Sequence, residues 1–132
     1  MQQYQNEWFE MKERHMGRLT THILDTASGR PASGITIEVF QVDGETRQHL
    51  ASAVTNADGR CDGPILEGAQ WQRGQYQLVF HAGPYLRATH SNLPDILFLD
   101  EITIGFGIDA ADQHYHVPLL LSPYGYSTYR GS

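Results

Sequence analysis

The sequence predicts an antiparallel β-sandwich, because three features of the chain are typical of that fold class. From Leu19 onward, apolar and polar residues alternate within short segments, and a period of two residues indicates strands with one buried face. Glycine, proline, asparagine and aspartate gather between these segments, where turns are needed. The only segment suited to a helix is brief and lies between Pro84 and Ser91. A chain of 132 residues supports one domain with a single core.

The first half of the chain contains three of the expected strands. Each shows alternating apolar residues bounded by turn-forming residues, which is the pattern of a half-buried strand. The expected strands are residues 19–25, 35–42 and 49–55. The expected turns are residues 26–34, 43–44 and 56–59.

The second half supplies the remaining strands of a sandwich with about six to eight in total. Residues 75–81 place three large apolar side chains on one face, and residues 101–108 and 114–122 continue the alternation. A turn then leads into a polar, aromatic strand that is poor material for a dry interior. We therefore expect a polar ligand to bind at this end of the chain.

Composition excludes several classes of function. The net charge of -6 comes from dispersed acidic residues, and Lys and Arg form no cluster, so we expect no nucleic-acid partner. Cys61 is the only cysteine, which excludes an internal disulfide and favours a cytoplasmic protein. Residues 1–17 form an N-terminal extension, helical or disordered, ahead of a domain at 18–132. The extension has no continuous apolar segment, so we expect neither a signal peptide nor a membrane span.

Three histidines are the strongest candidates for chemistry. His22 lies in mid-strand on the face of Thr20 and Leu24, where a hydrogen-bonded surface histidine is the simpler interpretation. His114 and His116 share one face of a later strand. Together the three could bind zinc, or one of them could accept a proton without a metal. No carboxylate or cysteine completes a metal motif, so the sequence favours the metal-free alternative.

Arg60 follows the Asp58-Gly59 turn, which places it at an end of the sandwich. It is either an ordinary solvated arginine or a guanidinium that reaches the carbonyl groups or the anionic ring of a ligand. Cys61 lacks an activating pattern, so a small packed thiol is favoured over a nucleophile.

These residues carry a resemblance to a known family. The segment 19–32, the turn Asp58-Gly59-Arg60 and the ending 114–132 resemble the 5-hydroxyisourate hydrolases, the enzyme branch of the transthyretin-related family. The likeness spans residues 18–132, and the final Tyr-Arg-Gly-Ser is the tetrapeptide that separates these hydrolases from hormone-carrying transthyretins.

The resemblance implies a prealbumin-like sandwich of two four-stranded sheets with one short helix, assembled as a homotetramer with its sites in the channel between dimers. It implies hydrolysis of 5-hydroxyisourate, a small-molecule substrate, to 2-oxo-4-hydroxy-4-carboxy-5-ureidoimidazoline, with no cofactor and no metal. The catalytic residues that it implies are His22, Arg60, His116 and Ser132. We expect Tyr129 and Arg130 to bind substrate beside His22 and Arg60, and His114 to be structural or to support the catalytic residues without touching substrate.

Two other classes of function remain open. One is a non-catalytic carrier of a planar aromatic ligand in the channel between dimers, in which the histidines and Arg60 would not be needed. The other is a structural or adhesion module, because many sandwiches of this type share the same turns. Such a module leaves the ending at 114–132 unexplained. The segment 87–99 ends in an apolar run that is unusual for a surface loop, and we expect it to pack against a neighbouring subunit.

Overall fold

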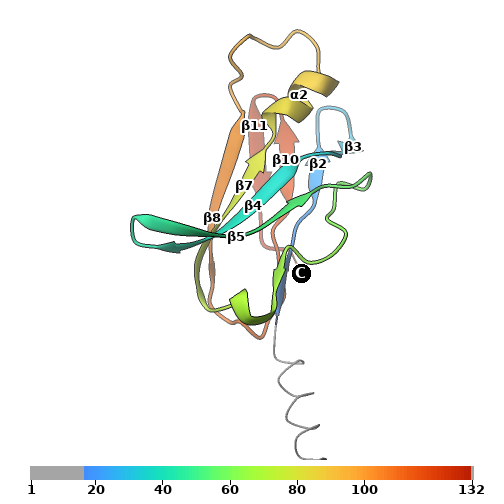
Figure 1. The fold of residues 1–132 in the computed structure, drawn as a ribbon. Helices are drawn as coiled ribbons and strands as arrows, with labels where there is room; N and C mark the ends of the chain where they lie inside the picture. The colour runs from blue at the N-terminus through green and yellow to red at the C-terminus, as the bar shows by residue number, and fades with distance from the viewer. Residues whose placement is uncertain (1–16, 132) are drawn as a thin grey trace, which may run out of the picture.

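The computed structural model describes residues 17–131 and confirms the predicted β-sandwich (Figure 1). The first elements are β1 (Arg18–Thr20), β2 (Ile23–Asp25), β3 (Arg30–Pro31), β4 (Thr36–Asp43), β5 (Thr46–Val54) and β6 (Leu66–Glu67). They are followed by the 3-10 helix η1 (Gly68–Gln70), β7 (Gly74–His81), α2 (Gly83–Thr89) and β8 (Glu101–Ile108). The chain ends with β9 (Tyr115–His116), β10 (Leu119–Ser122) and β11 (Gly125–Thr128).

The strands form two four-stranded sheets, ordered β5-β4-β7-β8 and β11-β10-β2-β3, and a smaller sheet ordered β6-β1-β9. The first of these is entirely antiparallel, as predicted. The pairs β1 with β9 and β2 with β10 are parallel, which differs from the predicted antiparallel pairing. Parallel neighbours require a long connection, and here almost the whole domain lies between the paired strands.

Two predicted strands are each broken in the middle. Residues 19–25 form β1 and β2 with a break at Thr21 and His22, and residues 114–122 form β9 and β10 with a break at Val117 and Pro118. Pro118 has no N–H to give to a ladder. The Thr21 hydroxyl instead donates to the Val117 carbonyl at 2.8 Å. The two breaks lie beside each other, and they separate the small sheet from the four-stranded one.

The core lies between the sheets and consists of the inward-facing residues of the alternating strands. Ile37, Val39, Leu78 and Phe80 are fully buried on β4 and β7. Burial of each such side chain stabilises the fold by about 1.5–3 kcal/mol. Every buried polar side-chain atom in residues 17–131 has a hydrogen-bond partner. The sheets are therefore a rigid base for side chains on the outer faces.

The helix predicted within residues 84–91 is α2, which has a proline in its first turn. Asp25, fully buried on β2, accepts hydrogen bonds from Tyr85 at 2.8 Å and from His90 at 2.7 Å. Burial alone would raise the pKa of Asp25, but the hydrogen bonds of His90, Tyr85 and the Ser28 backbone outweigh it and lower the pKa. This carboxylate holds the helix against the end of the sheet.

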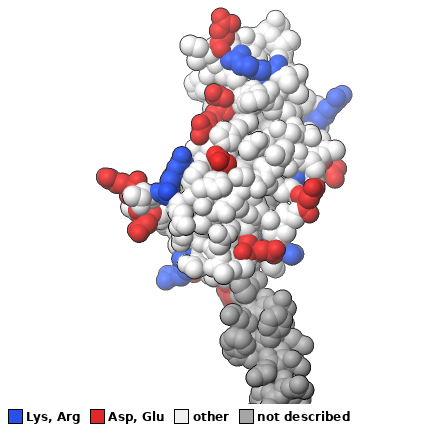
Figure 2. All heavy atoms as spheres, viewed as in Figure 1, with Lys and Arg blue, Asp and Glu red and all other residues white. Residues whose placement is uncertain are grey.

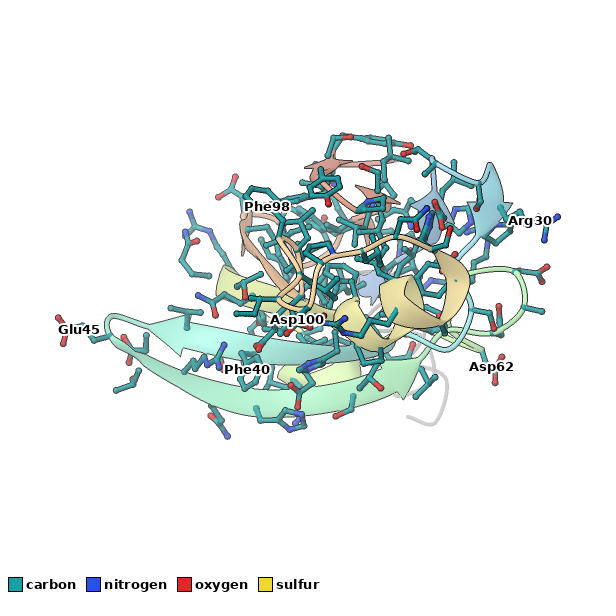
Figure 3. All side chains as sticks on the ribbon, turned by 90° about the horizontal axis from the view of Figure 1, so that it is seen from above. Arg30, Phe40, Glu45, Asp62, Phe98 and Asp100 are labelled. Atoms are coloured by element: carbon teal, nitrogen blue, oxygen red, sulfur yellow. The ribbon has the colours of Figure 1, made fainter. Side chains whose placement is uncertain are left out.

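The surface is consistent with the composition. Basic and acidic side chains are scattered on the face shown in Figure 2, and neither sign gathers into a patch. Figures 1 and 3 show the β4–β5 hairpin extending away from the sandwich, with Glu45 at its tip. No helix in the described range 17–131 is long and apolar enough to span a membrane. Cys61 is half-buried, and burial raises the pKa of its thiol.

Candidate functional site

The two histidines of the candidate site lie on the outer face of the sheet, at the break that separates the small sheet from the four-stranded one. His22 is half-buried between the buried Thr21 and Ile23, and His116 is half-buried between the buried Tyr115 and Val117. Thr20 and Leu24 are half-buried as well, so His22 shares a face with them, as the alternation predicts. Because Thr20 of β1 pairs directly with His116 of β9, the parallel register brings the two segments together.

A tight turn brings Arg60 beside His22. The Asn56 side chain accepts hydrogen bonds from the backbone N–H groups of Asp58 at 2.9 Å and Arg60 at 3.2 Å, which closes the turn. Gly59 adopts a φ of +73°, and a Cβ there would lie 2.4 Å from the Ile23 carbonyl oxygen. Only glycine allows this close approach without strain. Arg60 then forms an isolated antiparallel bridge with His22.

The electrostatics of the site favour neutral imidazoles. Burial lowers the pKa of His22, the Arg60 charge lowers it further, and a backbone hydrogen bond and the charge of Asp58 partly oppose them. Burial also lowers the pKa of His116, followed by the charges of Arg60 and His22, while a backbone hydrogen bond of Thr20 raises it. Arg60 therefore influences both histidines, and a neutral imidazole can accept a proton.

A neighbouring side chain also orients the ring of His116. The Nδ1 atom of His116 lies 2.9 Å from the Thr20 hydroxyl oxygen. This ring is therefore anchored by the strand beside it. An anchored imidazole presents its remaining nitrogen in one direction, which general base catalysis requires.

The end of the chain passes directly over His116. Gly131 forms an antiparallel bridge with His116, and its N–H donates to the His116 carbonyl at 2.7 Å. Arg130 stacks on the Tyr115 ring at 3.9 Å and donates to the Gln113 side chain at 2.9 Å. A further hydrogen bond joins Arg130 to the backbone carbonyl of His114 at 3.2 Å. The guanidinium of Arg130 thus fastens the last described residues to the body of the domain.

The structure brings together His22, Arg60 and His116, with the Arg130 backbone next to the bridge at Gly131. Tyr129 is 58% exposed, and Ser132 lies outside the described residues. His114 is exposed and offers its backbone carbonyl to Arg130. In the range 17–131, no three side chains of His, Cys, Asp or Glu are placed to hold a metal ion.

Sequence reasoning missed two contributors to the site. Thr20 was visible as a residue on the face of His22, but its contact with His116 spans 96 positions and could not be derived from spacing. Gly131 was visible only as part of the final tetrapeptide. A Cβ at Gly131 would lie 2.7 Å from Cδ2 of His116, so the chain can approach this ring as closely as it does only with glycine at position 131.

Known proteins match this chain over most of its length. The model of the "HIUase/Transthyretin family" matches residues 19–131. The "5-hydroxyisourate hydrolase 2" of Rhizobium meliloti is 59% identical over 116 residues, which cover 88% of this chain and 97% of that protein.

Two solved structures extend the comparison. The 5-hydroxyisourate hydrolase of Klebsiella pneumoniae has a TM-score of 0.70 and 37% identity, covering 89% of this chain and 95% of its own. Sea bream transthyretin, solved in complex with thyroxine, has a TM-score of 0.76 and 27% identity, covering 86% and 94%. From the match over residues 19–131 and these identities, the chain belongs to the HIUase/transthyretin family.

Proposed function

We propose that this chain hydrolyses 5-hydroxyisourate, the product of urate oxidation, to 2-oxo-4-hydroxy-4-carboxy-5-ureidoimidazoline. The observation that carries the proposal is the convergence of His22, Arg60 and His116 on one outer face. Relatives with 59% and 37% identity bear the name of this hydrolase. The thyroxine-bound transthyretin is more distant, at 27% identity.

In the proposed reaction, His22 and His116 position a water molecule and one of them removes its proton. The water oxygen bonds to a ring carbonyl carbon of the substrate, and the carbon–nitrogen bond of the cyclic amide breaks. The proton held by the imidazolium then passes to the departing nitrogen. One water is added overall, so atoms and charge balance. The lowered pKa values of both histidines support this role, because the base must begin unprotonated.

Arg60 is proposed to stabilise the negative charge that develops on the attacked carbonyl oxygen. A guanidinium with a fixed fork of donors suits this task, and donors that are already oriented provide the greatest stabilisation. Tyr129 and Ser132 are proposed to line the substrate ring. Arg130 is proposed to support substrate binding indirectly, by holding residues 129–131 against the domain. Its guanidinium already contacts Tyr115, Gln113 and His114.

The direct test generates 5-hydroxyisourate from urate with urate oxidase and follows its ultraviolet absorbance and circular dichroism. Spontaneous decay without the protein is the essential control. Accelerated decay with a transient optically active product is the expected result. Decay no faster than the control, from folded protein, would reject hydrolysis and favour a carrier of planar ligands.

The pH dependence should reflect the two lowered pKa values. A base works only when unprotonated, so kcat/KM should rise with pH and level off, with its midpoint below about 6.5, the ordinary histidine value. Substituting Arg60→Met removes a positive charge and should move both histidine pKa values upward in an NMR titration. His49 of β5 and His81 of β7 lie in the other four-stranded sheet and are the internal reference for this titration. A midpoint above the ordinary value, or no movement in Arg60→Met, would contradict this prediction.

We further propose a homotetramer and a cytoplasmic location, the latter supported only by the single cysteine. Two features support self-association. The edge strands β8 and β11 each have one neighbouring strand within the described range, and open edges readily pair with another chain. Phe98, labelled in Figure 3, is 71% exposed, and its ring lies 6.2 Å from that of Tyr124, which is 62% exposed. Phe98 lies in the loop before β8 and Tyr124 in the turn before β11, so the two rings form an apolar patch near the starts of these strands.

Substituting Phe98→Asp should shift the protein from tetramers to smaller species. A carboxylate in a buried interface loses its hydration without gaining a partner, which costs several kcal/mol. Size-exclusion chromatography with light scattering at micromolar concentrations measures the shift. Val54→Asp is the matched control. Val54 is also exposed, but it lies on β5, which is at the opposite edge from β8 in the β5-β4-β7-β8 sheet. An unchanged mass for Phe98→Asp would remove this loop from the interface.

A further inference from the structure

The Thr20 side chain contacts the imidazole of His116, one of the two candidate bases. Its hydroxyl oxygen lies 2.9 Å from Nδ1 of the imidazole. The two residues are direct partners in the parallel β1–β9 pair, so the contact is set by rigid backbone rather than by a loop. Thr20 is half-buried on the same outward face as His22. It is therefore next to the site and positioned to act through His116.

A neutral imidazole carries one N–H, and its position decides whether the ring can be a base. If Nδ1 holds the hydrogen, Nε2 has a free lone pair, whereas the other tautomer has an N–H at Nε2. A threonine hydroxyl can donate or accept, so this contact alone fits both tautomers. Only the tautomer with its hydrogen on Nδ1 leaves Nε2 free to take the proton of the water in the proposed reaction.

We propose that Thr20 is a positioning residue, whose hydroxyl accepts the Nδ1 hydrogen of His116 and leaves Nε2 free to remove a proton from water. This inference rests on the proposed function for its catalytic consequence. The tautomer itself is a property of the free protein, and it can be measured without any substrate. Within residues 17–131, the charged and polar groups that act on this imidazole are Arg60, His22 and Thr20, and of these the Thr20 hydroxyl contacts Nδ1.

The experiment compares the full-length wild-type protein with Thr20→Val and Thr20→Ser. Valine preserves the shape and removes the hydroxyl, and serine restores the hydroxyl. Long-range proton–nitrogen NMR spectra distinguish protonated from unprotonated ring nitrogens, and a His116→Asn sample identifies the signals of His116. Thr21→Val is the matched control, because the Thr21 hydroxyl donates to the Val117 carbonyl rather than to the imidazole.

Wild type and Thr20→Ser should show a protonated Nδ1 and an unprotonated Nε2, while Thr20→Val should gain the other tautomer. In the hydrolase assay, Thr20→Val should lose about tenfold in kcat with KM unchanged, the effect of one hydrogen bond that acts only through the base. Thr20→Ser should retain kcat within about twofold by the same argument.

An unprotonated Nδ1 in the wild-type protein would overturn the proposal even if Thr20→Val failed to fold. So would a Thr20→Val protein with unchanged tautomer and kcat, or equal losses in Thr20→Val and Thr21→Val. A wild-type protein that shows the expected tautomer but does not hydrolyse 5-hydroxyisourate would reject the proposed function and leave the role of Thr20 on His116 standing.

Discussion

Replacing Arg60 with lysine is expected to lower kcat/KM for 5-hydroxyisourate by at least about 100-fold, the usual cost of removing one donor to a developing oxyanion. Lysine keeps the positive charge, so charge alone cannot explain a loss of this size. The guanidinium presents several donors in a fixed plane, whereas an ammonium is a mobile point charge that is strongly hydrated. The turn that holds Arg60 is closed by backbone contacts to Asn56 and by Gly59.

Steady-state kinetics on purified Arg60→Lys measure this loss, with spontaneous substrate decay subtracted. Arg30→Lys is the matched control, because Arg30 is an exposed arginine of β3 and makes no described contact with the histidines. Circular dichroism and light scattering establish that fold and assembly are retained. Catalytic efficiency within a few-fold of wild type would show that Arg60 does not act in the chemical step.

Replacing Gly131 with alanine is expected to reduce kcat by about 10- to 100-fold, because misplacing a catalytic group by about 1 Å has effects of this size. The added methyl group would lie 2.7 Å from Cδ2 of His116 and 3.3 Å from its Cβ and Cγ. Real Cβ atoms do not approach so closely, so either the imidazole or the end of the chain must move. Both belong to the proposed site.

Gly125→Ala is the control for the Gly131 substitution. Gly125 begins β11 in the neighbouring hairpin, and among residues 17–131 an added Cβ would meet only the Ser122 hydroxyl oxygen, at 3.7 Å, an ordinary contact. Kinetics, thermal unfolding and the His116 ring signals in NMR separate a shifted imidazole from a general loss of stability. Wild-type kcat in Gly131→Ala, with unchanged His116 signals, would show that residue 131 can move away from the ring without displacing the proposed base.

The local pattern of the sequence predicted the strands well where an expected strand forms a single unbroken strand in the structure. The alternation in residues 35–42 and 75–81 predicted β4 and β7, and the turn formers at 43–44 predicted the hairpin between β4 and β5. Periodicity predicted less well where the strands break. The break at Val117 and Pro118 coincides with a proline that has no N–H for a ladder, and alternation of apolar residues does not take this local signal into account, so it predicted one strand instead of two.

The sequence by itself determined that His22 shares a face with Thr20 and Leu24 and that His116 lies on the face opposite Tyr115, since side chains alternate along a strand whatever its neighbours are. It also supplied the resemblance that selected Arg60 and the chain ending. Only the tertiary structure decided that Thr20 lies against His116 and that Gly131 passes over the same ring. The physical reason is that the register between segments far apart in the chain is set by packing of the whole core, which no local spacing contains.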